Sequence, residues 1–176
     1  MELTVNLFHP NADGLIEQAV RQLLAGCGEP PVILCIGSDK VTGDALGPMV
    51  GHLLTRRFNV PAFVYGTLEH PVTANNLSVA NRFIKTYHPD AKVLAIDAAL
   101  SDTREIGLIY FRNKGVQAGK ALGKTLPCSG DYSITAVVNT GSDSAASKLF
   151  STSLHTVIRL AESIAEALFE SIKVYA

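Results

Sequence analysis

Two aspartates stand where an α/β protein would hold catalytic acids. Asp44 lies in the loop Gly37–Pro48, between an apolar segment and a helix, and Asp97 directly follows the apolar run Val93–Ile96. Open α/β sheets bind ligands beyond the carboxyl ends of their strands, where we expect both residues. If the two strands are neighbours, one aspartate can activate water while the other protonates a leaving amine. The pair therefore predicts acid–base hydrolysis of a peptide bond.

Each aspartate also has a structural interpretation. Asp44 could be a helix N-terminal residue, stabilised by the helix dipole at about 0.3–1 kcal/mol. Asp97 could accept hydrogen bonds from loop amides, but a carboxylate at the end of a buried strand must be paired or desolvated, and desolvation raises its pKa. A catalytic role is favoured for Asp97, and both interpretations of Asp44 stay open at this point.

Five residues of the loops after the first two predicted strands are candidates for substrate binding. They are Gly43, Thr67, Glu69, His70 and Asn75. The combination of Asp44, His70 and Asp97 would also offer oxygen and nitrogen ligands to a metal. No HxxxH, HxH or CxxC motif accompanies them, so no metal and no other cofactor is expected.

Other catalytic motifs are missing from the sequence. There is no GxGxxG, no GxxxxGK[ST] and no GxSxG, which disfavours a nucleotide site and a serine nucleophile elbow. The three cysteines, Cys27, Cys35 and Cys128, show no paired spacing, so neither a disulfide framework nor a zinc ribbon is predicted. Cysteine catalysis is a minor alternative at Cys128.

Five basic residues face one acid, Glu105, in the stretch 104–124. They are Arg104, Arg112, Lys114, Lys120 and Lys124. An ordinary solvated loop surface explains such a run, and the alternative is a platform for an acidic peptide or protein. On the second interpretation Lys120 and Lys124 bind substrate.

Apolar segments alternate between strand and helix character, which predicts one α/β domain over residues 1–176 with a mostly parallel sheet. The predicted strands are Val32–Ile36, Ala62–Tyr65, Val93–Ile96, Ile106–Arg112 and Ser133–Val138. Helices are expected between Asn11 and Gly26, from about Pro48 to Phe58, from Thr73 to Tyr87 and from Ser142 to Lys173. The glycine-containing stretch 115–130 is expected to be a long loop.

Composition limits the classes of partner and compartment. The chain has 176 residues, 47% apolar and 18% charged, with a net charge of −1. No bulk charge draws it to nucleic acid or anionic lipid, and its longest apolar run, Val32–Ile36, is too short to span a membrane. The N-terminus lacks the pattern of a signal peptide, so we expect a cytoplasmic protein. The low charge also allows a homo-oligomer.

Several of these motifs together resemble the YyaC sporulation proteins. The matching stretches are Gly43–Pro48 (GDALGP), Gly66–Pro71 (GTLEHP), Ile96–Ala99 (IDAA), Gly119–Pro127 and Gly130–Ile134, and the resemblance covers roughly residues 30–170. That family is related to the germination protease of spore formers and more remotely to nickel-hydrogenase maturation endopeptidases. The resemblance implies a phosphorylase/hydrolase-like fold, a three-layer α/β/α sandwich with a mostly parallel twisted sheet.

The resemblance also implies a function. It places the two catalytic aspartates of the germination protease on Asp44 and Asp97, with small acid-soluble spore proteins as candidate substrates in the forespore or mother cell. The nickel-binding histidine of the hydrogenase endopeptidases has no counterpart, because no histidine lies between His88 and His155. The leading prediction is a germination-protease-like endopeptidase. The alternative is a non-catalytic sporulation factor that binds a protein or peptide in the same cleft.

Overall fold

A mixed sheet of six strands runs through the protein in the order β1-β5-β6-β4-β2-β3. The fold comes from a computed structural model, which describes residues 2–117, 128–141 and 144–175. The strands are β1 (Glu2–Asn6), β2 (Val32–Cys35), β3 (Val64–Tyr65), β4 (Val93–Ser101), β5 (Leu108–Arg112) and β6 (Tyr132–Thr140). Adjacent strands among β3, β2, β4 and β6 pair in parallel, and β5 runs antiparallel to its neighbours β6 and β1. The mostly parallel sheet is as predicted.

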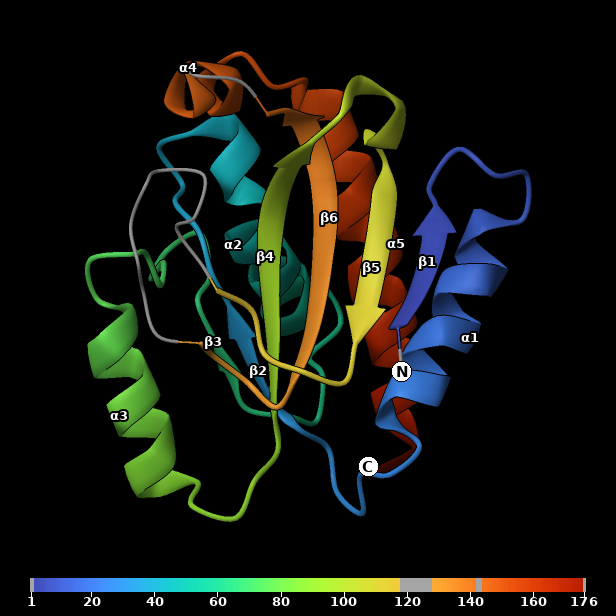
Figure 1. The fold of residues 1–176 in the computed structure, drawn as a ribbon. Helices are drawn as coiled ribbons and strands as arrows, with labels where there is room; N and C mark the ends of the chain where they lie inside the picture. Colours follow the sequence, from blue (N-terminus) through green and yellow to red (C-terminus); the bar gives the residue numbers. More distant parts are fainter. Residues whose placement is uncertain (1, 118–127, 142–143, 176) are drawn as a thin grey trace.

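Helices cover both faces of this sheet and make three layers, as Figure 1 shows. They are α1 (Ala12–Leu24), α2 (Leu46–His52), α3 (Leu77–Tyr87), α4 (Ala145–Phe150) and α5 (Leu154–Ile172). The helices α1, α2 and α5 bury the larger apolar cluster against strand residues such as Ile33, Leu94 and Ile134. Helix α3 packs on the opposite face, against Leu34 and Ala95. The α/β/α sandwich is confirmed.

Side chains that alternate along β4 tell which residues share a face. Leu94 and Ile96 point to the larger cluster, and Ala95 points to the cluster under α3. Since successive side chains of a strand point to opposite faces, Asp97 lies on the α3 side of the sheet. Its parallel neighbour on β6 is Thr135. Asp97 of β4 and Thr135 of β6 therefore project from the same face of the sheet.

Several elements differ from the prediction, and three of these differences change the architecture or the position of Asp97. The strand β1 had not been predicted, because its five residues form a short edge strand on which only Val5 is fully buried. The segment predicted as one helix from Ser142 to Lys173 contains two helices, α4 and α5. Thr152 Oγ1 donates a hydrogen bond to the Lys148 carbonyl, and Ser153 Oγ accepts one from the Thr156 amide, which starts α5. Side-chain hydroxyls thus divide a continuous apolar stripe.

The third difference concerns β4, which continues to Ser101, so that Asp97 lies within the strand and does not follow it. Residues beyond Asp97 stay paired with β6 as far as Thr140, with one register shift after Ala99. The strand therefore continues past the apolar run Val93–Ile96.

In the described part of the chain, no helix has both the length and the apolar character needed to cross a bilayer.

Candidate functional site

Asp97 is a buried acid at the centre of the sheet. Only 7% of its surface is exposed, and its Oδ1 accepts a hydrogen bond from the Ala98 amide at 2.9 Å. Burial raises the pKa of Asp97 well above its ordinary value of 3.8, and the negative charge of Asp44 raises it further. The Ala98 amide opposes this rise only in part. Asp97 therefore keeps its proton to a higher pH than an ordinary aspartate does.

Asp44 reaches the same region from the loop that follows β2, the strand next to β4. It lies in a short 3₁₀ helix, Thr42–Ala45, just before α2. Burial raises the pKa of Asp44 from 3.8 to about 6, and hydrogen bonding by the Ser38 amide offsets part of that rise. The strands β2 and β4 pair directly, so the condition for bringing the two aspartates together is met. Two acids with different proton affinities thus interact electrostatically across one site.

Gly37 makes the tight turn that brings Asp44 into place. The Ser38 amide donates to the Asp44 carbonyl at 3.0 Å, which closes the loop. The φ of Gly37 is +146°, and a Cβ at this position would lie 2.0 Å from the Asp44 carbonyl oxygen. Only glycine allows this approach, because any side chain would push the Asp44 backbone away.

We expect Gly37→Ala to lower the free energy of unfolding by at least about 2 kcal/mol, because the added methyl group meets backbone that cannot move freely. The matched control is Gly26→Ala, since a Cβ at Gly26 would meet nothing within 4 Å. Urea unfolding followed by circular dichroism measures both variants. Equal stability of the two variants would show that the loop around Asp44 yields to a side chain.

Both aspartates line a cleft of about 980 Å³ on the α3 side of the sheet. Its lining residues come from β1, β4, β5, β6 and α4, from the segment 114–117, and from Cys128 and Gly141. Polar members beside the acids are Glu2, Arg112, Lys114, Ser133 and Thr135. The volume lies at the upper end of the range typical for ligand sites, which suits an extended peptide.

Arg112 and Thr135 both line the cleft: Arg112 belongs to the basic stretch predicted as a possible platform for an acidic partner, whereas Thr135 was not predicted as a site residue. Arg112 Nη1 donates to Thr135 Oγ1 at 3.0 Å, and Arg112 Nε donates to Glu2 Oε1 at 2.8 Å. The guanidinium also lies over the Tyr110 ring, 4.5 Å from its centroid. The available signal was the alternation of polar with apolar residues in β5 and β6, which places these side chains on one face with Asp97.

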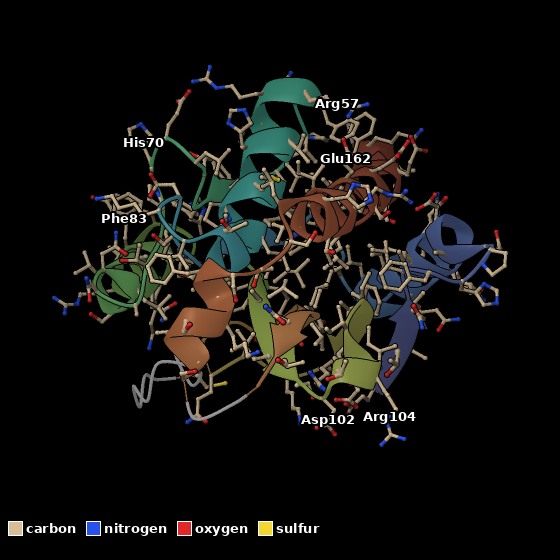
Figure 2. All side chains as sticks on the ribbon, turned by 90° about the horizontal axis from the view of Figure 1, so that it is seen from above. Arg57, His70, Phe83, Asp102, Arg104 and Glu162 are labelled. Carbon is tan, nitrogen blue, oxygen red and sulfur yellow. The ribbon has the colours of Figure 1, made fainter. Side chains whose placement is uncertain are left out.

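The predicted substrate residues of the loop after β3 do not line this cleft. Glu69 is exposed and pairs with Arg56 at 2.6 Å, which lowers the pKa of Glu69, and the Thr67 hydroxyl accepts a hydrogen bond from the His70 amide. In Figure 2, His70 lies at the opposite side of the molecule from Asp102, the residue that directly follows β4. The reason is topological: β3 is the edge strand beyond β2, whereas the cleft extends from β4 toward β5.

The remaining predicted substrate residues are placed as follows. Asn75 is exposed, and its amide donates to Thr73 Oγ1 in the turn before α3. Gly43 is buried, and a Cβ there would lie 2.5 Å from Thr152 Oγ1, so this glycine permits close packing against the start of α5. Lys120 and Lys124 lie outside the described residues.

The metal alternative finds little support in the described residues. They contain no group of three or more His, Cys, Asp and Glu side chains arranged to hold a metal ion. His70, the candidate nitrogen ligand, is exposed and is not part of the cleft lining.

Known proteins share both the sequence and the fold of this chain. Residues 5–167 match a family model described as "Protein of unknown function (DUF1256)". YyaC of Bacillus subtilis (strain 168) is 35% identical over 146 residues, which cover 83% of this chain and 71% of YyaC. These matches confirm the resemblance to YyaC that the motifs indicated.

The fold is similar to that of a solved protease. A [NiFe] hydrogenase maturation protease, HycI from Thermococcus kodakarensis KOD1, superposes with a TM-score of 0.57 and 18% identity, covering 88% of this chain and 98% of the protease chain. At this identity the likeness establishes a shared, protease-like fold. On the strength of the match over residues 5–167, the chain belongs to the DUF1256 family.

Proposed function

We propose that this protein is an endopeptidase in which Asp44 is the general base and Asp97 the general acid. The observation that carries the proposal is the pair of acids in one cleft with pKa values raised to different extents. At neutral pH Asp44, with a pKa of about 6, is mostly ionised, which suits a base. Burial and the charge of Asp44 both raise the pKa of Asp97, so Asp97 is the group to which we assign the proton. Such a division between two carboxyl groups supplies a base and an acid to one reaction.

The reaction follows from these two protonation states. The Asp44 carboxylate takes a proton from water, whose oxygen attacks the carbonyl carbon of the scissile peptide bond. The tetrahedral intermediate then breaks its C–N bond as Asp97 gives its proton to the departing nitrogen. The products are a carboxylic acid and an amine, and proton exchange with water restores the starting state of both aspartates.

The substrate class comes from the sequence resemblance. A relation to sporulation proteins and, more remotely, to the germination protease supports a spore protein as substrate, with small acid-soluble spore proteins as first candidates. The protease-like fold is consistent with peptide hydrolysis. Because one fold can host many chemistries, the proposal depends on the two aspartates of the cleft. The wide cleft would accept an extended segment of such a protein.

Incubation with purified small acid-soluble spore proteins tests the proposal, with products identified by mass spectrometry. We expect defined internal cleavage by the wild-type protein and none by the double variant Asp44→Asn/Asp97→Asn. Asp39→Asn is the matched control, because Asp39 is an exposed acid of the same loop as Asp44 and does not line the cleft. Cleavage that persists in the double variant would contradict the assignment.

The competing interpretation is a protein that binds a spore protein in this cleft and does not cleave it. The cations Arg112 and Lys114 in the lining favour an acidic partner. Binding without products in the same incubation, weakened by charge reversal at Lys120 and Lys124 and by added salt, would support this interpretation.

A further inference from the structure

Thr135 is the neighbour of Asp97 in the sheet, and its hydroxyl accepts a hydrogen bond from Arg112. Thr135 is only 6% exposed and is the register partner of Asp97 on the adjacent parallel strand. Neighbouring strands lie about 4.8 Å apart, so both side chains rise from the same row of the same face. A hydroxyl has one proton to donate and two lone pairs to accept with. Arg112 Nη1 occupies a lone pair, and among the described residues no acceptor takes the proton.

Arg112 is itself fixed in place and largely buried. Its side chain is 23% exposed, its Nε is bonded to Glu2, and its guanidinium lies over the Tyr110 ring. These contacts and the bond to Thr135 use two of the five N–H donors of the guanidinium. The other three have no partner within the ranges that the structure describes. A fixed cation with spare donors therefore lines the cleft beside a polarised hydroxyl.

We infer that Thr135 and Arg112 form a carbonyl-binding subsite, which holds the oxygen of the scissile peptide bond and stabilises its negative charge in the tetrahedral intermediate. The inference rests on the proposed peptidase function. Thr135 donates its proton to the oxygen, and Arg112 strengthens that donor and offers its free N–H groups. Donors fixed before the reaction stabilise developing charge more than water does, because they need no reorganisation. The position beside Asp97 puts the carbonyl carbon near the acid pair.

A purely structural role is the alternative for both residues. Arg112 joins β5 to β1 through Glu2, and Thr135 fills a buried position on β6. Such roles would change thermal stability but would not distinguish a charged tetrahedral group from a neutral carbonyl. The test therefore compares ligands that differ in this group.

The probes are a short phosphinic peptide, with a tetrahedral P–O⁻ group in place of the scissile carbonyl, and the matching neutral ketomethylene peptide. We expect the wild-type protein to bind the phosphinic peptide at least about 10-fold more tightly in isothermal titration calorimetry. The preference should disappear in Thr135→Val and in Arg112→Met, and it should survive in Thr135→Ser, which keeps the hydroxyl. Equal binding of both peptides by the wild-type protein would overturn the subsite.

Two controls remove similar groups away from the cleft lining. Thr4→Val makes the same change as Thr135→Val at an exposed position of β1, in the same row of the sheet. Arg159→Met removes an exposed cation of α5. Both should keep the wild-type preference. Thr135 and Arg112 are changed in separate variants. If one variant does not fold, the binding preference of the other variant still tests the subsite.

Kinetics separate this inference from the proposed function. If the wild-type protein cleaves spore proteins, Thr135→Val should lower kcat by about 10²-fold with little change in KM. A wild-type protein that prefers the phosphinic peptide and cleaves nothing would leave the subsite standing and refute the peptidase. A peptidase that loses no more than a few-fold in kcat in both variants would refute the subsite alone.

Discussion

Asp97→Asn should nearly abolish the proposed cleavage of a spore protein and at the same time stabilise the fold. Asparagine cannot give a proton to the leaving amine, so we expect kcat/KM to fall by about 10³-fold, within the usual range for general acid–base groups. Asparagine still offers Oδ1 to the Ala98 amide, which now bonds to Asp97. The cleavage assay with mass spectrometry measures the loss of activity.

The gain in stability follows from the raised pKa of Asp97. The unfolded chain releases this proton near pH 3.8, whereas the native protein keeps it to a much higher pH. Native stability therefore falls as pH rises from the unfolded pKa toward the folded pKa. Asparagine carries no such cost, so the variant should melt above the wild type at pH 7, by about 2–4 °C for each kcal/mol gained.

The pH dependence provides the control. The difference in Tm between Asp97→Asn and the wild type should be small below about pH 4, where both states hold the proton, and should grow toward neutrality. Calorimetric melting curves across this range measure it. A variant that is less stable than the wild type at pH 7 would show that the carboxyl group is held ionised by a partner.

Asp44→Asn is the second change with a large expected effect. Loss of the base should lower kcat/KM at pH 7 by about 10³-fold. In the wild type, kcat/KM should rise as pH passes through about 6, because Asp44 must lose its proton to act as base. Residual activity of the variant should lack this rise. A pH–rate profile of both proteins provides the measurement.

Asp39→Asn is again the matched control and should keep the full profile. Retention of activity within a few-fold in Asp44→Asn would leave Asp44 with its structural interpretation at the start of α2. A rise near pH 6 that persists in the variant would assign that step to a group other than Asp44.

The sequence predicted the central sheet because its buried strands are continuous apolar runs. Val32–Ile36 and Val93–Ile96 are short, rich in branched side chains and followed by polar residues, and both are central strands with the two aspartates beside them. Periodicity also predicted α1 and α5. These strands and helices form the core, and the hydrophobic pattern of a sequence predicts core elements directly.

The extent of the cleft could not be predicted from the hydrophobic pattern. It depends on β5 running antiparallel beside β6, which brings Arg112 next to Thr135, although 23 positions separate them in the chain. The loop that carries His70 was expected near the acids because it also follows a strand. Its strand is at the sheet edge, and strand order is set by packing of the whole chain, which residue spacing does not reveal.

The central claim is that Asp44 and Asp97 hold different protonation states in one cleft, and a ¹³C NMR titration of their side-chain carboxyls tests it most directly. We predict that Asp44 titrates near pH 6, that Asp97 titrates at a higher pH, and that Asp44→Asn lowers the pKa of Asp97. The titration needs no substrate and reports on the pair alone. Titration of both carboxyls together near pH 4, unchanged by the substitution, would contradict the account.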